Sequence, residues 1–291
     1  MEFWLQLQQR LPPLAFDAIK FGNGLLLLLL ILAPLERLFA LRRRPRVWWR
    51  RPDLATDLAY YFLSSLLPSR LLALPLAALA WGLAAGLPPG WGDWSQALPA
   101  PPRFVLAFLV AECGFYWGHR AMHRWPLLWR LHLIHHSPAE LDWLANTRAH
   151  PLDLVFTRLC GYVPLYLLGL AQGGPGQLDT VPLLISLAGS VWGYLIHANL
   201  RWRWRPLQRL IATPAFHHWH HERLAPGQAA CNYAALLPLF DLLFGSYRVP
   251  AAWPTRYGID EIVAPDLAGQ LVQPFAGPPR LSETPSGLRP D

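Results

Sequence analysis

The sequence predicts an all-α fold, an integral membrane helical bundle of about four to five crossings with a histidine-rich cap on the cytoplasmic side. Three observations predict it. Hydrophobic residues make up 53% of the 291 residues and charged residues only 15%, whereas soluble domains carry about 25% charged residues. Long apolar segments recur between short loops, and all 11 histidines lie within residues 119–221.

Several apolar segments are long enough to cross a bilayer as helices. A hydrocarbon core of about 30 Å requires roughly 20 apolar residues. The candidate spans are about 22–40, about 57–86, about 103–119, about 152–170 and about 181–197. The second span contains Pro68 and Arg70, so we expect a kinked or tilted helix, or an interfacial piece followed by a span.

The loops between these spans predict which side of the membrane holds the histidines. Residues 42–51 carry six arginines and two tryptophans, which is typical of a cytoplasmic, interface-anchored loop. Residues 87–102 and 171–181 contain no Lys or Arg and belong on the opposite side. Residues 120–150 and those after 198 then lie in the cytoplasm, and the membrane expected is the bacterial inner membrane.

Composition also argues against some classes of function. The net charge of +7 comes almost wholly from arginine, but no basic–aromatic module or groove-reading helix for nucleic acid is present. No nucleic-acid partner is therefore expected. The cysteines, Cys113, Cys160 and Cys231, have no paired or CxxC spacing, and we assign them no role.

The histidines are grouped with helical spacing. Eight of them form three groups: His119 and His123; His132, His135 and His136; and His217, His220 and His221. Residues four apart lie on one helix face. His150 and His197 lie where the fourth predicted span begins and the fifth ends. The predicted topology brings all of these to one membrane face, which favours a metal site.

So many convergent imidazoles exceed the capacity of one ion, which takes about four to six ligands. We therefore expect a two-metal cluster. Imidazole suits Fe, Zn, Cu and Ni alike, so spacing alone does not identify the metal. The sparse carboxylates nearby are expected to orient imidazole N–H groups rather than to bind metal. These carboxylates are Glu112, Glu140, Asp142, Asp153 and Glu222.

The segments HRAMH at 119–123, HLIHH at 132–136 and HHWHH at 217–221 resemble the three histidine boxes of the sterol desaturase and fatty acid hydroxylase superfamily. Flanking segments agree, among them NTRAHPLD at 146–153 and HANL at 197–200. The resemblance covers roughly residues 105–250. One box alone would be weak evidence, but three boxes in order with these flanks are a specific signal.

The resemblance implies a membrane di-iron oxygenase that uses O2 and two external electrons to hydroxylate or desaturate a C–H bond of a lipid. Zinc is an alternative metal in purified protein. The chain carries no flavin, Fe–S or haem motif, so an external reductase or ferredoxin-like donor is expected. The expected ligands are His119, His123, His132, His135, His136, His150, His197, His217, His220 and His221.

On this basis the chain divides into N-terminal membrane helices over 1–100, a fatty acid hydroxylase-like catalytic domain over 101–250 and a flexible C-terminal tail over 251–291. It departs from the family pattern at two places. His218 is an additional histidine in the third box, expected beside the ligands or at the cap surface. In the segment that follows, Cys231 stands where an acidic residue is usual and Ala234 where glycine is usual.

Two other functions stay open. A zinc-dependent membrane hydrolase would use the same imidazoles, but HHER at 220–223 does not provide the general-base carboxylate of an HExxH arrangement. A non-catalytic metal- or haem-binding membrane protein is the other alternative. Bis-histidine haem carriers place one histidine per helix near mid-membrane, whereas these histidines cluster at helix ends. The lipid itself is not identified by the sequence.

Overall fold

The computed structural model describes residues 6, 8–43, 51, 53–88, 90–171, 180–225 and 227–276. Within these residues the regular elements are helices, accompanied by two isolated β-bridges, so the predicted all-α fold is confirmed. Most of the arginine-rich loop (44–50) and of the loop at 171–181 (172–179) lies outside the described residues. The orientation that these loops predict therefore stays a prediction.

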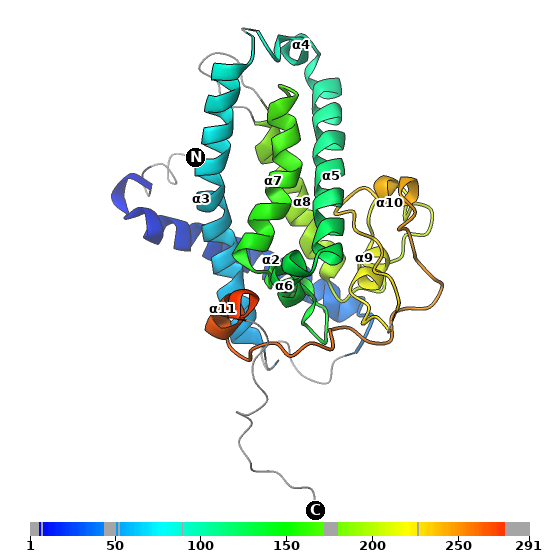
Figure 1. Cartoon of the computed structure of the whole chain (residues 1–291). Helices are drawn as coiled ribbons and strands as arrows, with labels where there is room; N and C mark the ends of the chain where they lie inside the picture. Colours follow the sequence, from blue (N-terminus) through cyan, green and yellow to red (C-terminus); the bar gives the residue numbers. More distant parts are fainter. Residues whose placement is uncertain are drawn as a thin grey trace, which may run out of the picture.

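Five long helices coincide with the five predicted spans. They are α2 (Pro13–Leu38), α3 (Leu54–Gly86), α5 (Ala100–Arg124), α7 (Pro151–Leu167) and α8 (Val181–His197). Helices α3, α5 and α7 stand side by side, and α2 runs obliquely across the lower end of the bundle (Figure 1). By length and composition α2 and α3 are able to cross a membrane, and α8 is apolar but shorter. The number of crossings stays a prediction.

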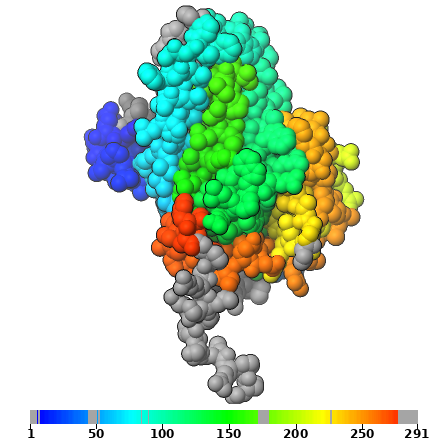
Figure 2. Space-filling model, in the orientation of Figure 1, coloured from blue at the N-terminus to red at the C-terminus, as the bar shows by residue number. Residues whose placement is uncertain are grey.

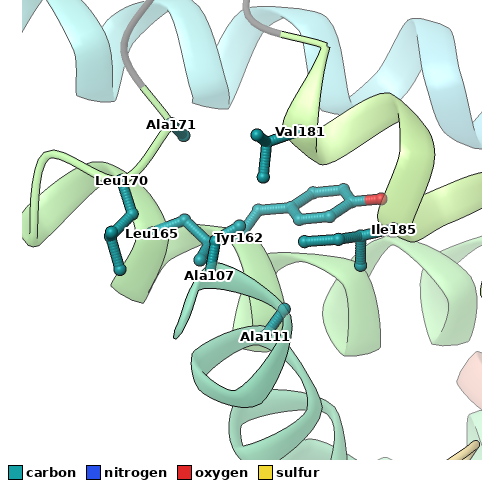
Figure 3. Close-up of a cluster of buried hydrophobic side chains, with 8 residues drawn as sticks. All are labelled: Ala107, Ala111, Tyr162, Leu165, Leu170, Ala171, Val181 and Ile185. Carbon is teal, nitrogen blue, oxygen red and sulfur yellow. The ribbon is translucent and has the colours of Figure 1, made fainter. Parts of the chain in front are cut away.

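Helices α5 and α7 approach each other closely because small residues line their contact. A Cβ atom on Gly114 would meet the backbone of Cys160, and one on Gly118 would meet its side chain. Small residues let helix backbones pack closely in membrane proteins. Farther from the histidines, a cluster of buried apolar side chains joins α5, α7 and α8 (Figure 3). The close contact of Gly114 and Gly118 with α7 fixes the end of α5 that carries His119.

Short elements gather at the lower end of the bundle in Figure 1 and form the histidine-bearing cap. They are α6 (Pro126–His136), the 3-10 helix η2 (Trp143–Thr147), α9 (Pro214–His220) and α11 (Leu267–Ala276). The short α10 (Leu239–Leu243) lies beside α5, and α4 (Asp93–Gln96) lies at the opposite end of the bundle. Proline in the first turn starts both α6 and α9, a position where its missing N–H costs nothing. Thr213 caps α9 by accepting from the Phe216 N–H.

The prediction that residues 251–291 form a flexible tail is corrected for residues 251–276. Leu267 and Leu271 of α11 pack with Tyr60 and Ile134, and Figure 2 shows α11 against the end of the bundle. The buried Gln270 donates to the carbonyl of Ala264 at 2.9 Å. Apolar contacts and buried amides thus order a segment whose proline and glycine content suggested disorder. Residues 277–291 lie outside the described residues.

Candidate metal centre

The structure brings nine of the ten expected ligands into two groups. Site A consists of His119, His123, His132, His136 and His220. Site B consists of His135, His197, His217 and His221. Within each site the ligand nitrogens lie within 4.8 Å of one another. With three or more donors apiece, each site is large enough to hold one metal ion.

Helical spacing explains how the histidines are shared between the two sites. The i and i+4 pairs stay together: His119 with His123 and His132 with His136 in site A, and His217 with His221 in site B. Neighbouring residues on a helix point about 100° apart. The consecutive pairs His135–His136 and His220–His221 therefore each contribute one ring to each site.

The two sites lie next to each other. The rings of His136 in site A and His221 in site B are stacked, with centroids 4.3 Å apart. The rings of His136 and His220, both in site A, have centroids 4.7 Å apart. The second and third histidine boxes therefore bring sites A and B side by side, which is the arrangement that a two-metal cluster requires.

Site B contains two imidazole nitrogens whose lone pairs face each other. His135 Nδ1 lies 3.1 Å from the Arg148 carbonyl and His197 Nδ1 lies 2.7 Å from the Gly193 carbonyl. A carbonyl only accepts, so both Nδ1 atoms carry the proton of a neutral ring. The two Nε2 atoms, 3.2 Å apart, are then both acceptors. A cation between the two Nε2 atoms would satisfy both lone pairs, whereas two acceptors cannot form a hydrogen bond with each other.

Site A repeats this arrangement with a carboxylate. His119 Nδ1 lies 2.7 Å from the Tyr233 carbonyl, and His132 Nδ1 lies 2.7 Å from Asp153 Oδ2. In the neutral rings both Nε2 atoms carry lone pairs, and they are 3.1 Å apart. Two nitrogens each about 2.1 Å from one metal ion at a right angle are about 3 Å apart. The spacing in both sites fits metal ligation.

Site A also holds buried nitrogens that lack a hydrogen-bond partner among the described residues. They are the Nε2 atoms of His123, His136 and His220. A buried polar atom left unsatisfied costs about 1–3 kcal/mol. His220 Nδ1 is satisfied, because it donates to the Cys231 carbonyl at 2.8 Å. Metal binding is the arrangement that would satisfy all three Nε2 atoms together.

Burial favours the neutral form of several of these imidazoles. It lowers the pKa of His135 to about 4. Burial also holds the pKa values of His217 and His221 well below the ordinary 6.5, with neighbouring imidazoles adding to the effect. Neutral imidazole is the form that binds metal, so the cap presents its ligands ready for metal at neutral pH.

The structure does not bring His150 to either site. His150 is buried at the start of α7, where its Nδ1 accepts from the Leu152 N–H at 3.2 Å. Its Nε2–H donates to the Leu271 carbonyl at 3.1 Å. Both ring nitrogens are therefore used, one to cap α7 and one to hold α11.

His218 lies beside the ligands and is buried, so the expected alternative of a surface position is wrong. Its Nε2–H donates to the carbonyl of Ala198 at 3.0 Å, and its Nδ1 accepts from the Tyr257 hydroxyl at 2.6 Å. Ala198 directly follows His197. The extra histidine of the third box thus holds the backbone next to a ligand of site B.

Of the carboxylates expected to orient imidazoles, Asp153 orients the ring of His132. Three others have different partners: Glu112 accepts from the backbone of 236–237, Asp142 caps η2 and Glu222 pairs with Arg248. The remaining orienting acceptors are backbone carbonyls, including that of Cys231. Replacing the usual acidic residue by cysteine therefore leaves this support of His220 in place.

The histidine-bearing part of the chain is similar to known proteins. A family model described as fatty acid hydroxylase matches residues 104–246. Ornithine lipid hydroxylase OlsE of Rhizobium tropici is 37% identical over 63% of this chain and 53% of its own length. Alkylglycerol monooxygenase of Danio rerio is 32% identical over 53% of this chain and 32% of its own length.

Methylsterol monooxygenase 2-2 of Arabidopsis thaliana is 26% identical over 66% of this chain and 67% of its own length. The chain thus spans about half of the hydroxylase and about a third of the alkylglycerol enzyme. No solved structure gives a significant match.

Proposed function

The chain belongs to the sterol desaturase and fatty acid hydroxylase superfamily, and we propose that it is a membrane di-iron oxygenase acting on a lipid. The reaction proposed is hydroxylation, or desaturation, of a lipid C–H bond with O2 and two external electrons. Its substrate class is supported by the relatives, whose names describe lipid hydroxylases and monooxygenases.

One observation carries this proposal: nine imidazoles, most of them buried, form two adjacent sites in which acceptor nitrogens face each other. We propose these nine histidines as the metal ligands. Iron, when bound there, supplies the redox chemistry with O2 that no side chain provides. Imidazole donors suit an oxidising centre, because thiolates are themselves oxidised.

The chain's own residues prepare the sites for this chemistry. Asp153 and the carbonyls of residues 148, 193, 231 and 233 hold the Nδ1–H groups, which turns each Nε2 towards the metal positions. Such partners fix the tautomer and the ring direction of a metal-binding histidine. Most of these histidines are buried, which limits the access of water to the sites.

The proposed place of the enzyme is the bacterial inner membrane, with the sites facing the cytoplasm. The arginine-rich stretch 42–51 supports this orientation through the positive-inside bias. A site at the end of the bundle lets a lipid keep its head group near water while its chain stays in the membrane. We propose an external reductase or ferredoxin-like protein as the electron donor.

Lipid profiling tests the function even while the substrate is unidentified. Total lipids of a host expressing the chain are compared by mass spectrometry with those of a host expressing His135→Ala or His220→Ala. We expect a lipid species that gains one oxygen atom, or loses two hydrogen atoms, only with the parent chain. Both variants remove a ligand and should still insert into the membrane.

Growth without O2 separates an oxygenase from a hydrolase that uses the same imidazoles. An oxygenase product disappears without O2, whereas a hydrolysis product persists. A product that forms without O2, or that survives both histidine substitutions, would reject the proposal.

A further inference from the structure

A cavity of about 400 Å³ opens beside site A. Its wall includes the ligand His123, two arginines, Arg120 and Arg124, and the rings of Trp129 and Tyr233. None of the described residues on this wall is acidic. The volume lies within the range of about 300–1,000 Å³ that is typical of small-molecule sites. The cavity is therefore a basic compartment that reaches a proposed metal ligand.

Arg120 is held in place by neutral partners. Its Nη1 donates to the Tyr116 hydroxyl at 2.7 Å and to the Phe244 carbonyl at 3.2 Å, and the guanidinium lies 5.4 Å from the Trp117 ring centroid. Asp241 lies behind the cavity wall, where it accepts from the hydroxyl of Ser246 and from two backbone N–H groups. These bonds occupy its carboxylate inside the fold.

Arg124 lies one helical turn beyond Arg120 on α5 and is exposed. Residues four apart share a helix face, and both guanidinium groups line the same cavity. A guanidinium presents a fork of N–H donors that matches the oxygens of a carboxylate or phosphate. Two of them around one concave space favour a small oxyanion over the broad surface of a protein partner.

The surface next to these arginines is apolar. Trp117, Leu243 and Phe244 expose 47%, 65% and 41% of their areas, and the rings of Trp117 and Phe244 have centroids 4.9 Å apart. Figure 1 shows α10, which precedes Phe244, beside α5. A basic cavity joined to an apolar surface matches an amphiphile with an anionic head and a hydrocarbon chain.

We propose that this cavity binds the oxyanion of a lipid head group, a phosphate or a carboxylate, through Arg120 and Arg124. The inference rests on the proposed function in one respect, namely that the lipid held there is the substrate. Because His123 forms part of the same wall, the bound head group lies next to site A. The C–H bonds nearest the metal positions are then those close to the head group.

Binding to the full chain in a neutral detergent tests this inference without metal, O2 or turnover. The probe is 1-oleoyl lysophosphatidate, compared with 1-oleoylglycerol, which lacks the phosphate, and with glycerol 3-phosphate, which lacks the chain. We expect lysophosphatidate to bind about tenfold more tightly than either. Arg124→Gln should weaken its binding about threefold and Arg120→Gln about tenfold.

Arg130→Gln is the matched control, because Arg130 is also exposed and lies on α6 away from the cavity wall. It should bind lysophosphatidate as the parent does. Arg124 is exposed, so its substitution stays informative if Arg120→Gln fails to fold.

Three results would overturn the inference. One is equal affinity for 1-oleoylglycerol, and another is equal affinity for glycerol 3-phosphate, which would indicate a site for free oxyanions. The third is that Arg124→Gln binds lysophosphatidate as tightly as Arg130→Gln does. If the Arg124→Gln variant then also had lower turnover, Arg124 would be a contact for the electron donor and not for the lipid. Loss of the oxygenase product in the lipid profiles would leave this binding result untouched, so the two proposals fail separately.

Discussion

In five of the nine histidines, the direction of the ring is set by the partner of its Nδ1 atom. In His132 this partner is the carboxylate of Asp153, at 2.7 Å, and in His197 it is a carbonyl of its own helix, at 2.7 Å. A carboxylate also raises the basicity of the imidazole that it holds. Asp153 is therefore expected to strengthen metal binding although it lies outside both sites.

Asp153→Asn tests this role. The amide keeps the size of the side chain but removes its charge, so we expect the affinity for metal to fall about tenfold to a hundredfold. The affinity is measured by competition of the loaded protein with a chelator. Glu222→Gln is the matched control, because Glu222 pairs with Arg248 and should leave metal affinity unchanged. Equal affinities in the two variants would show that Asp153 has no such role.

His150 is distinguished from the ligands by substitution with asparagine. Asparagine caps helix N-termini well, so His150→Asn should lower stability mainly through the lost bond to the Leu271 carbonyl, by about 1–3 kcal/mol, and keep its metal. His197→Asn, in contrast, removes a nitrogen of site B and should lose metal. Metal content of the two purified variants decides the matter. Equal loss of metal from both variants would indicate that His150 is a ligand after all.

The buried imidazoles also make stability depend on pH. Burial holds the pKa of His135 at about 4, against 6.5 in the unfolded chain. Between these values the unfolded state binds more protons than the folded state, so the free energy of unfolding falls as the pH falls. We expect the Tm of chelator-treated protein to drop between about pH 6.5 and about pH 4. A Tm that is constant over this range would contradict the buried, neutral state.

At the scale of elements, the contact between α5 and α7 positions the first histidine box. Gly118 directly precedes His119 and packs on Cys160 of α7, as does Gly114 one turn earlier. A side chain at either glycine would push the helices apart. Because α7 also carries Asp153 near its start, the same displacement would move the partner of His132.

Gly114→Ala is expected to destabilise the protein by about 1–3 kcal/mol through overpacking and to lower its metal content. Gly189→Ala on α8 is the matched control, because a Cβ there meets nothing within 4 Å. Alanine is a better helix former than glycine by about 1 kcal/mol, so the control should be neutral or stabilising. Thermal unfolding of both variants measures the difference. A Gly114→Ala variant as stable as Gly189→Ala would refute the role of this contact.

At the scale of the whole molecule, the N-terminal helices are tied to the metal sites by polar contacts. Glu36 near the end of α2 accepts from the N–H groups of Trp143 and Asn199, at 2.9 and 2.7 Å. Asp57 near the start of α3 accepts from the buried Arg148 at 2.5 Å, and the Arg148 carbonyl orients His135. Helices α2 and α3 thus also support the cap.

The sequence predicts the helical class, the five long helices and nine histidines that the structure gathers into two sites, because apolar segments and i, i+4 spacing are properties of the side chains themselves. It does not predict the division into sites A and B, which follows from the direction of neighbouring residues such as His135 and His136 on one helix. It also cannot separate His150 from the ligands, since a histidine before a helix suits capping and metal binding alike.

Other features leave no signal in the sequence. The acceptors that orient His119 and His220 are backbone carbonyls, which any residue supplies. The folding of residues 251–276 depends on contacts of Leu267 and Leu271 with helices far away in the chain. Such long-range packing outweighs the local composition, which suggested a tail.

The central claim, that sites A and B each hold one metal ion, is tested most directly by counting the metal. The full chain is purified without O2, loaded with ferrous iron and freed of excess metal, and its iron is measured per chain. We predict about two ions per chain, and fewer in both His136→Ala and His221→Ala, whose stacked rings belong to different sites. One ion or none in the parent chain, or two ions in either variant, would contradict the account.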